Sequence, residues 1–368
     1  MNRSLPTVPA AESTGSSPHR NGWAPETVVL PLVNLLASIH IVWFYVYRVP
    51  SYLNLQRFEA GQERMPFQSR VLMQYPLRWA HGSSALGHFA AWLTGIHLWI
   101  PSEILPEDLV EAAVNLIAVL IAGLVARELY RIHSKTRLLT AYVYPLFLVM
   151  VVGSYCLQSI NFYRYVYDLP SLGLLSVGFY LIARRSHPAL FALLFVVATI
   201  NRETSLFLLY FFLASSCVVE EKIVWRRAVS WRFGGTATLL GIFWIAWHLW
   251  TRWRFAGLHV VQGPGLFFNF ACLLFPLTWP QLAGIAGYTL ASFVLFRREI
   301  RSAELRLWLW GFPIWFAFMM YFGNMIELRI FGELIPLFAC TAVLLAEERI
   351  HLRAARLFPG TSAIGSVP

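Results

Sequence analysis

Long blocks of apolar residues alternate with short polar connections along this chain, a pattern typical of helices that cross a membrane. A helix needs about 20 mostly apolar residues to span the hydrocarbon core of a bilayer. The blocks predict an all-α polytopic transmembrane bundle of about ten spans, with both termini on one side of the membrane. The predicted spans are 27–47, 107–126, 138–157, 168–183, 188–200, 204–219, 233–250, 280–296, 307–323 and 330–346.

The connection 48–106 is much longer than the others and predicts helices that lie at the external surface. Phe67, Tyr75 and Trp79 belong to a set of apolar residues at helical spacing beside arginines, which indicates an amphipathic interfacial helix. The apolar piece 81–100 is interrupted by glycines and is interpreted as a second interfacial helix, with a re-entrant or spanning pair as the alternative. The segment 263–279 is apolar enough to enter the bilayer but is broken by Pro276 and Pro280, and it is interpreted as shallow or re-entrant.

Both ends of the chain have compositions that predict disordered tails. Residues 1–25 are rich in Pro, Ser, Thr and Gly. The segment 351–368 is likewise predicted to be disordered from its composition. The domain organisation expected from the sequence is therefore one transmembrane helical domain, 26–350, between two short tails.

Composition excludes soluble classes of protein, and the charge distribution predicts an orientation. The chain has 58% hydrophobic and only 13% charged residues, against about 25% charged in soluble domains. Of its 29 Lys and Arg residues, 19 lie on the side of the termini under the ten-span topology. Loops rich in Lys and Arg stay on the cytoplasmic side of a membrane, so we expect both termini in the cytoplasm. We expect the protein to lie in a bacterial inner membrane. The net charge of +10 is thereby explained without a nucleic-acid partner.

Polar residues at membrane depth are costly and mark functional sites. Under the predicted topology four polar clusters all lie on the external face. They are 58–70, 161–170, 201–204 and 324–336.

Three of the four clusters also have a purely structural interpretation. Arg202 and Glu203 are adjacent and can neutralise each other at a buried turn, and Thr204 can cap the helix that follows. Asp168 begins a predicted span and can serve as its N-cap. Arg329 and Glu333 are four residues apart and can pair on one helix face.

No cofactor or metal is expected from the motifs. The ten histidines include no pair at i, i+4, the spacing of a helical zinc site, and P-loop, GxGxxG and GxSxG motifs are lacking. The four cysteines show no metal-binding spacing and are interpreted as packing residues.

The layout resembles that of the GT-C-type polytopic glycosyltransferases: a first span, a long external loop with interfacial helices, and further short helices around a cavity. The segments YVYDLP, NRET and ELRIFGELIP are also similar to those of bacterial membrane proteins of unassigned activity. The resemblance implies transfer of a sugar from a polyprenyl-phosphate-linked donor held in the membrane. It implies no metal-binding pattern, because this chain lacks the family's acidic pairs.

Glycosyl transfer needs a carboxylate base and cations that stabilise the departing phosphate. The resemblance places Glu59 first as the base, because it corresponds in position to the family's first-loop acid, with Asp168 and Glu203 behind it. The predicted substrate-binding residues are arginines for phosphate, aromatic residues for sugar rings, and neighbouring polar groups. They are Arg70, Arg164, Tyr165, Tyr167, Asn201, Arg202, Glu327, Arg329 and Glu333.

The residues alone are also compatible with two other classes of function. A transporter or flippase for an anionic or lipid-linked substrate would also hold charges in a central cavity. A non-catalytic component of polysaccharide export is the third interpretation.

Overall fold

Helices are the regular structure of the described residues apart from one short hairpin, so the all-α class predicted from the sequence is confirmed. A computed structural model describes residues 25–96, 103–158, 162–261 and 265–357. The proposed tail 1–25 therefore lies outside the described residues except for its last position. The hairpin pairs β1 (Val218–Val219) with β2 (Lys222–Ile223) in antiparallel register.

The long helices coincide closely with the predicted apolar blocks, and short helices fill the connections. The first half of the chain forms α1 (Pro25–Arg48), α2 (Leu55–Glu59), η1 (Phe67–Ser69), η2 (Val71–Met73), α3 (Gln74–His81), α4 (Ser84–Gly95), α5 (Pro106–His133), α6 (Thr140–Val151), the π-helical turn η3 (Val152–Cys156) and α7 (Asp168–Ala183). The second half forms α8 (Pro188–Asn201), η4 (Glu203–Ser205), α9 (Leu206–Ser216), η5 (Trp225–Arg227), η6 (Trp231–Gly235), α10 (Thr236–Arg254), α11 (Gly265–Leu274), η7 (Pro276–Thr278), α12 (Trp279–Ala283), η8 (Ile285–Tyr288), α13 (Leu290–Leu295), η9 (Arg297–Glu299), α14 (Ala303–Phe322), η10 (Leu328–Leu334) and α15 (Ile335–Leu357).

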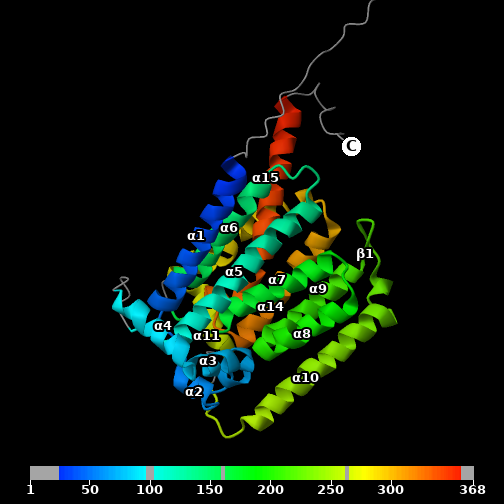
Figure 1. Ribbon diagram of the computed structural model, residues 1–368. Coiled ribbons are helices and arrows are strands. Elements are labelled where there is room, and N and C mark those ends of the chain that lie inside the picture. Colours follow the sequence, from blue (N-terminus) through cyan, green and yellow to red (C-terminus); the bar gives the residue numbers. More distant parts are fainter. Residues whose placement is uncertain (1–24, 97–102, 159–161, 262–264, 358–368) are drawn as a thin grey trace, which may run out of the picture.

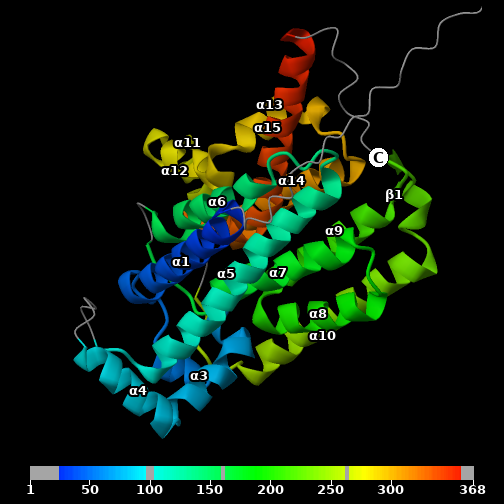
Figure 2. The same cartoon turned by 45° about the horizontal axis from the view of Figure 1, so that its top comes forward.

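Helix α5 lies at the centre of the bundle and contacts α1, α6, α7 and α15 (Figures 1 and 2). It approaches α7 most closely at Gly173, where a Cβ atom would come within 2.9 Å of Ala118. Small residues let helix backbones approach in this way, which is how apolar helices pack where the hydrophobic effect cannot drive them together. The α5–α7 pair fixes the start of α7, and with it Asp168.

The apolar helices make this a membrane protein. Within the described residues, four helices are long and apolar enough to cross a bilayer, and a fifth crossing results if the bent pair Gly265–Leu274 and Pro276–Ala283 counts as one span. They are Val28–Arg48, Pro106–His133, Ala303–Phe322 and Leu328–Leu357. Four more apolar helices are shorter, at 10–17 residues, so the count of ten spans is not confirmed. Large apolar side chains such as Leu32 and Leu36 on α1, and Leu239 and Ile242 on α10, are exposed on the outer surface.

The predicted span 280–296 is wrong as a single helix. The chain there forms α12, η8 and α13, because Ala286, Gly287 and Tyr288 adopt positive φ angles of 56°, 57° and 64°. A right-handed helix cannot continue through such residues. The preceding apolar segment is bent by 85° between α11 and the helix that follows, in keeping with the re-entrant interpretation or with a broken span.

The long connection 48–106 is less continuous than the sequence predicts. The amphipathic segment is divided into η1, η2 and α3, because Arg70 has a non-helical backbone with φ −92° and ψ 66°. Tyr75 and Trp79 are exposed on α3, while Leu77 is buried. The second predicted piece, 81–100, forms α4 up to Gly95, and its last four residues lie outside the described residues. At the other end of the chain, α15 continues to Leu357, past the predicted start of the C-terminal tail.

Figure 1 shows the beginning of α1 and the end of α15 at one end of the bundle. Helices α2, α3 and α4 lie at the opposite end. This second end carries the loops that hold the predicted polar clusters.

Candidate functional site

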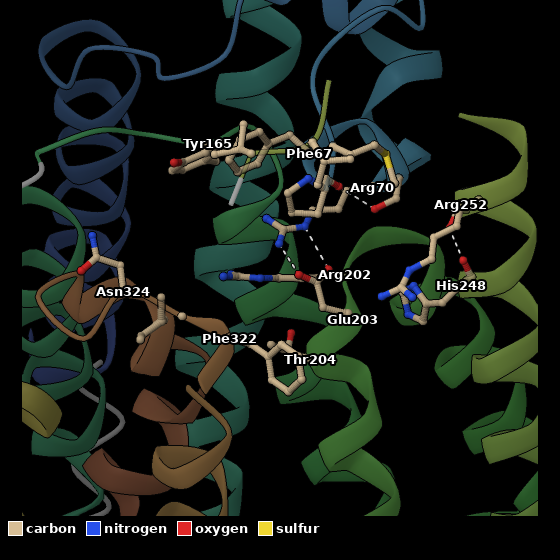
Figure 3. Close-up of a pocket in the computed structure, with 18 of the residues that line it drawn as sticks. Phe67, Arg70, Tyr165, Arg202, Glu203, Thr204, His248, Arg252, Phe322 and Asn324 are labelled. Carbon is tan, nitrogen blue, oxygen red and sulfur yellow. Dashed lines mark hydrogen bonds and ion pairs between the residues drawn. The ribbon is translucent and has the colours of Figure 1, made fainter. Parts of the chain in front are cut away.

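A cavity of about 1130 Å³ lies where the loop after α1 meets the first residues of α7, the turn between α8 and α9, and the ends of α10 and α14 (Figure 3). One side is polar and carries arginines, carboxylates and tyrosines. The other side is apolar, with residues of α10 and α14 such as Trp244, Leu249, Phe318 and Phe322. Leu249 and Phe322 are also exposed on the outer surface, so this wall reaches the outside of the bundle.

All four polar clusters singled out in the sequence contribute to this one cavity. The members that line it include Arg70 from the first cluster, Tyr163, Tyr165 and Asp168 from the second, Arg202, Glu203 and Thr204 from the third, and Asn324, Glu327 and Arg329 from the fourth. Residues as far apart in the chain as Arg70 and Arg329 therefore meet on one polar surface. Asn161, also in the second cluster, lies outside the described residues.

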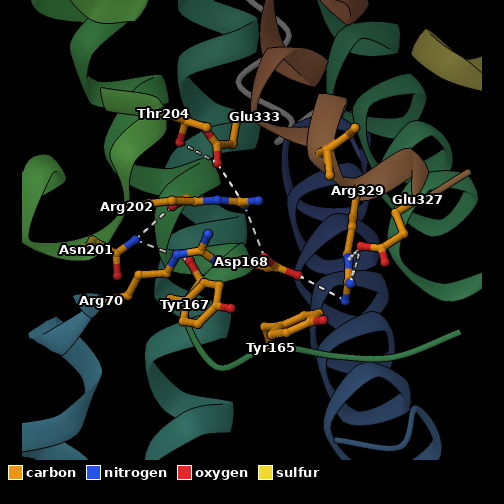
Figure 4. A network of polar contacts seen from close by, with 12 residues as sticks. Arg70, Tyr165, Tyr167, Asp168, Asn201, Arg202, Thr204, Glu327, Arg329 and Glu333 are labelled. Atoms are coloured by element: carbon orange, nitrogen blue, oxygen red, sulfur yellow. Dashed lines mark hydrogen bonds and ion pairs between the residues drawn. The ribbon is translucent and has the colours of Figure 1, made fainter. Parts of the chain in front are cut away.

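Asp168 holds two arginines at the floor of the cavity (Figure 4). Its Oδ1 accepts a hydrogen bond from Arg202 Nη1 at 3.1 Å, and Oδ2 lies 3.7 Å from Arg329 Nη1. The Tyr45 hydroxyl also donates to Oδ2, at 3.4 Å. Asp168 is the first helical residue of α7 and the N-cap position is occupied by Tyr167, so Asp168 is not the N-cap; its two oxygens face the arginines instead.

Arg202 is shared between two buried carboxylates. Besides Asp168 it contacts Glu333 Oε1, at 2.9 Å, and the Thr204 hydroxyl donates to the same oxygen at 3.0 Å. Thr204 thus binds a carboxylate from η10 instead of capping α9. The Nε of Arg202 is buried and has no partner among the described residues.

Arg329 does not pair with Glu333, which the i, i+4 spacing had suggested. It binds Glu327, with Nε 3.2 Å from Oε2, and its guanidinium lies over the Tyr165 ring, 3.8 Å from the centroid. The reason is local geometry: residues 328–334 form a 3₁₀ helix, in which residues i and i+3 align and i+4 is rotated by about 120°.

Glu203 binds Arg70 from the long loop after α1, not its neighbour Arg202. Nε of Arg70 lies 3.0 Å from Oε2 of Glu203, and Nη2 contacts the other oxygen. The Arg70 guanidinium covers the Tyr167 ring at 4.4 Å. Trp244 Nε1 donates to the Glu203 carbonyl at 3.0 Å, which attaches α10 to this turn. Glu203 is the most exposed of these acids, with 28% of its side chain accessible.

Five of the predicted site residues do not line the cavity. Asn201, Tyr167 and Glu333 are buried behind it, where the Asn201 amide donates to the Tyr167 carbonyl and the Ser171 hydroxyl. The Arg164 guanidinium turns toward α5 and pairs with Asp108 at 3.3 Å. The last is Glu59, at the end of α2.

Glu59 lies in a separate polar group, beside His81 and Glu107. Burial and the neighbouring Glu107 carboxylate raise the pKa of Glu59 above its usual value. The pKa of His81 is raised as well, chiefly by its hydrogen bond to Glu107.

The sequence analysis missed the contribution of α10. Trp244, His248 and Arg252 recur every four residues and line the cavity along one face of this helix. That spacing is visible in the sequence, but it could not show which face meets the external loops. Arg252 is exposed and forms no ion pair with any residue that the structure describes.

The site is therefore a cationic, water-accessible floor beside an apolar wall. Four arginines and three carboxylates line it: Arg70, Arg202, Arg252 and Arg329 against Asp168, Glu203 and Glu327. Guanidinium groups bind phosphate oxygens in paired hydrogen bonds, so the polar floor favours an anionic group. No protein family model, curated protein or solved structure matches the chain.

Proposed function

We propose that the protein is an integral membrane glycosyltransferase that uses a polyprenyl-phosphate-linked sugar as donor. The observation that carries the proposal is the division of one cavity into an arginine-rich floor and an apolar wall that reaches the outer surface. A polyprenyl-phosphate sugar has the matching division, with an anionic head and a hydrocarbon tail. Tail and head can then enter together from the bilayer, without the tail passing through water.

The head group has cations available to it. Arg252 lines the cavity from an exposed position and is not neutralised by a carboxylate in the described part of the chain, so its guanidinium nitrogens are free to donate. Such donors would stabilise the phosphate as negative charge develops on it. Tyr165 and Tyr167 have one ring face covered by a guanidinium, whereas Tyr163 lines the cavity and is 39% exposed. We assign sugar stacking to Tyr163.

Glu203 is the proposed general base. The acceptor oxygen attacks the anomeric carbon, the bond from that carbon to the phosphate oxygen breaks, and polyprenyl phosphate departs. The acceptor hydroxyl proton passes to Glu203. Asp168 lines the same cavity but is only 1% exposed and engaged by Arg202 and Arg329, so we assign it to positioning. Glu59 lies outside the cavity and is not used in this scheme.

The proposal also requires an orientation. The cavity opens on the side away from the cytoplasm, and the beginning of α1 and the end of α15 lie on the cytoplasmic side. Single cysteines at the exposed positions Gln62 and Ser230 test it, because the four native cysteines are buried. In intact cells a membrane-impermeant maleimide is expected to label Gln62→Cys and not Ser230→Cys. Labelling of Ser230→Cys before the cells are opened would contradict this orientation and the ten-span arrangement.

The decisive experiment presents purified protein in nanodiscs with a set of polyprenyl-phosphate sugars and an acceptor mixture. Mass spectrometry is expected to detect polyprenyl phosphate and a glycosylated product. If the protein, reconstituted in vesicles, moves the intact polyprenyl-phosphate sugar across the membrane and forms no glycosylated product, the transporter is favoured instead.

The binding step has its own test, in which polyprenyl phosphate is expected to bind and the uncharged polyprenol to bind more weakly. Arg252→Ala should lower the affinity for polyprenyl phosphate about fivefold, because an exposed cation contributes about 1 kcal/mol or less. Arg254→Ala is the matched control, two residues further along α10, exposed and outside the cavity lining. Equal affinities for the phosphate and the alcohol would refute an anion-binding floor.

A further inference from the structure

Three potential metal ligands converge at the external end of the bundle, away from the cavity. Glu59 is the last residue of α2, His81 is the last residue of α3, and Glu107 lies in the first turn of α5. The His81 Nδ1 atom lies 2.5 Å from Glu107 Oε1 and 3.8 Å from Glu59 Oε2. One potential ligand atom from each residue lies within 4.8 Å of the other two.

These spacings suit a small divalent cation. Zinc binds imidazole nitrogen and carboxylate oxygen at about 2.0–2.2 Å, which places tetrahedral ligand atoms about 3.4 Å apart. One nitrogen and two oxygens from three residues form a three-ligand set that leaves the fourth position to water. Nitrogen in the set disfavours magnesium and calcium, which prefer oxygen ligands.

The two carboxylates lack the partners that burial normally requires. The Glu59 and Glu107 side chains are each 8% exposed, and Glu59 Oε1 and Glu107 Oε2 have no hydrogen-bond partner among the described residues. Two partnerless carboxylate oxygens at close range are costly, because desolvation and mutual repulsion both disfavour their charge. A single imidazole nitrogen close to Glu107 does not satisfy both acids.

The surroundings position the ligands and leave a route for entry. Gln74 Nε2 and Arg78 Nε both donate to the Glu59 backbone carbonyl at 3.0 Å, which fixes the end of α2. The Arg78 guanidinium, the neighbouring cation, is therefore engaged with the main chain. His81 is 62% exposed, so an ion can reach the group from the solvent.

We infer that Glu59, His81 and Glu107 form a binding site for a divalent transition-metal ion, with zinc as the best match. The ion would join the ends of α2 and α3 to the beginning of α5 and so secure the external loop on the bundle. This site is separate from the proposed transferase cavity, and the inference does not depend on the proposed function.

The test measures metal, so its outcome does not depend on any enzymatic activity. The purified full-length chain is stripped with a chelator, equilibrated with Zn²⁺ and analysed by elemental mass spectrometry, and affinity is measured by competition with a zinc indicator. We expect one Zn²⁺ per chain, undisturbed by excess Mg²⁺. Glu59→Gln, His81→Gln and Glu107→Gln should each weaken zinc binding at least about tenfold.

His88→Gln is the matched control, because His88 is exposed on α4 at the same end of the bundle. Its zinc content should equal that of the unmodified chain. His81→Gln keeps the test valid if a buried-acid variant fails to fold, since His81 is exposed. Less than one zinc per chain, or unchanged affinity in folded His81→Gln, would overturn the site and leave an ion pair between His81 and the two acids.

Discussion

Replacing Glu203 with Gln is expected to slow sugar transfer from a lipid-linked donor by about 10²–10⁴-fold, the usual contribution of a general base. The amide keeps the size of the side chain and can still accept one hydrogen bond from Arg70, but it cannot take the acceptor proton. Binding of the polyprenyl-phosphate donor should change little, because the donor phosphate is assigned to the arginines. Turnover and donor affinity measured on the same nanodisc preparation separate these two effects.

Glu103→Gln is the control for this substitution, since Glu103 is exposed just before α5 and lies outside the cavity lining. It should leave turnover unchanged. If Glu203→Gln keeps wild-type turnover and folded Glu59→Gln loses it, then Glu59 in the first external loop is the general base. If only Asp168→Asn loses turnover while remaining folded, then Asp168 at the start of α7 is the general base.

Replacing Asp168 with Asn is expected to destabilise the fold by about 3–5 kcal/mol, the usual cost of breaking a buried ion pair from one side. Asp168 is 1% exposed, and it faces Arg202 and Arg329, which are 7% and 2% exposed. Without the carboxylate, Arg329 would retain Glu327 and Arg202 would retain Glu333, but the shared negative charge between them would be lost. Thermal unfolding followed by tryptophan fluorescence in detergent, with the yield of monodisperse protein, measures the effect.

A surface acid provides the comparison for Asp168. Glu128 pairs with Arg131 at 2.9 Å, and its side chain is 31% exposed, so Glu128→Gln should cost about 1 kcal/mol or less. If Asp168→Asn unfolds no more readily than Glu128→Gln, then Asp168 does not anchor the two arginines.

The amino-acid sequence by itself determined where most of the helices lie. Runs of apolar residues mark α1, α5, α7 and α8 to within a few residues, with a longer C-terminal extension at α5, because a helix satisfies its own backbone hydrogen bonds. The break at Ala286–Tyr288 was not predictable in the same way, since the residues around it are apolar and only their backbone angles interrupt the helix. In the described part of the chain four helices, or five if the bent pair is one span, are long and apolar enough to cross a bilayer, so the count of ten spans stays a prediction.

The sequence also marked the polar clusters, but it could not assign their partners. Adjacent Arg202 and Glu203 bind different segments because Arg202 has an extended backbone, with φ −161° and ψ 146°, and successive side chains of an extended chain point to opposite sides. Arg329 and Glu333 separate because η10 winds as a 3₁₀ helix.

Only the tertiary structure decided which distant charges share a site. Glu203 meets Arg70 across 133 positions of sequence, and His81 meets Glu107 across 26. Such pairs leave no periodic signal, because each partner lies at the end of a different helix and their distance depends on how α5, α7 and the external loop pack. Helix positions follow from local hydrophobicity and backbone hydrogen bonding, whereas the partner of a buried charge is set by long-range packing.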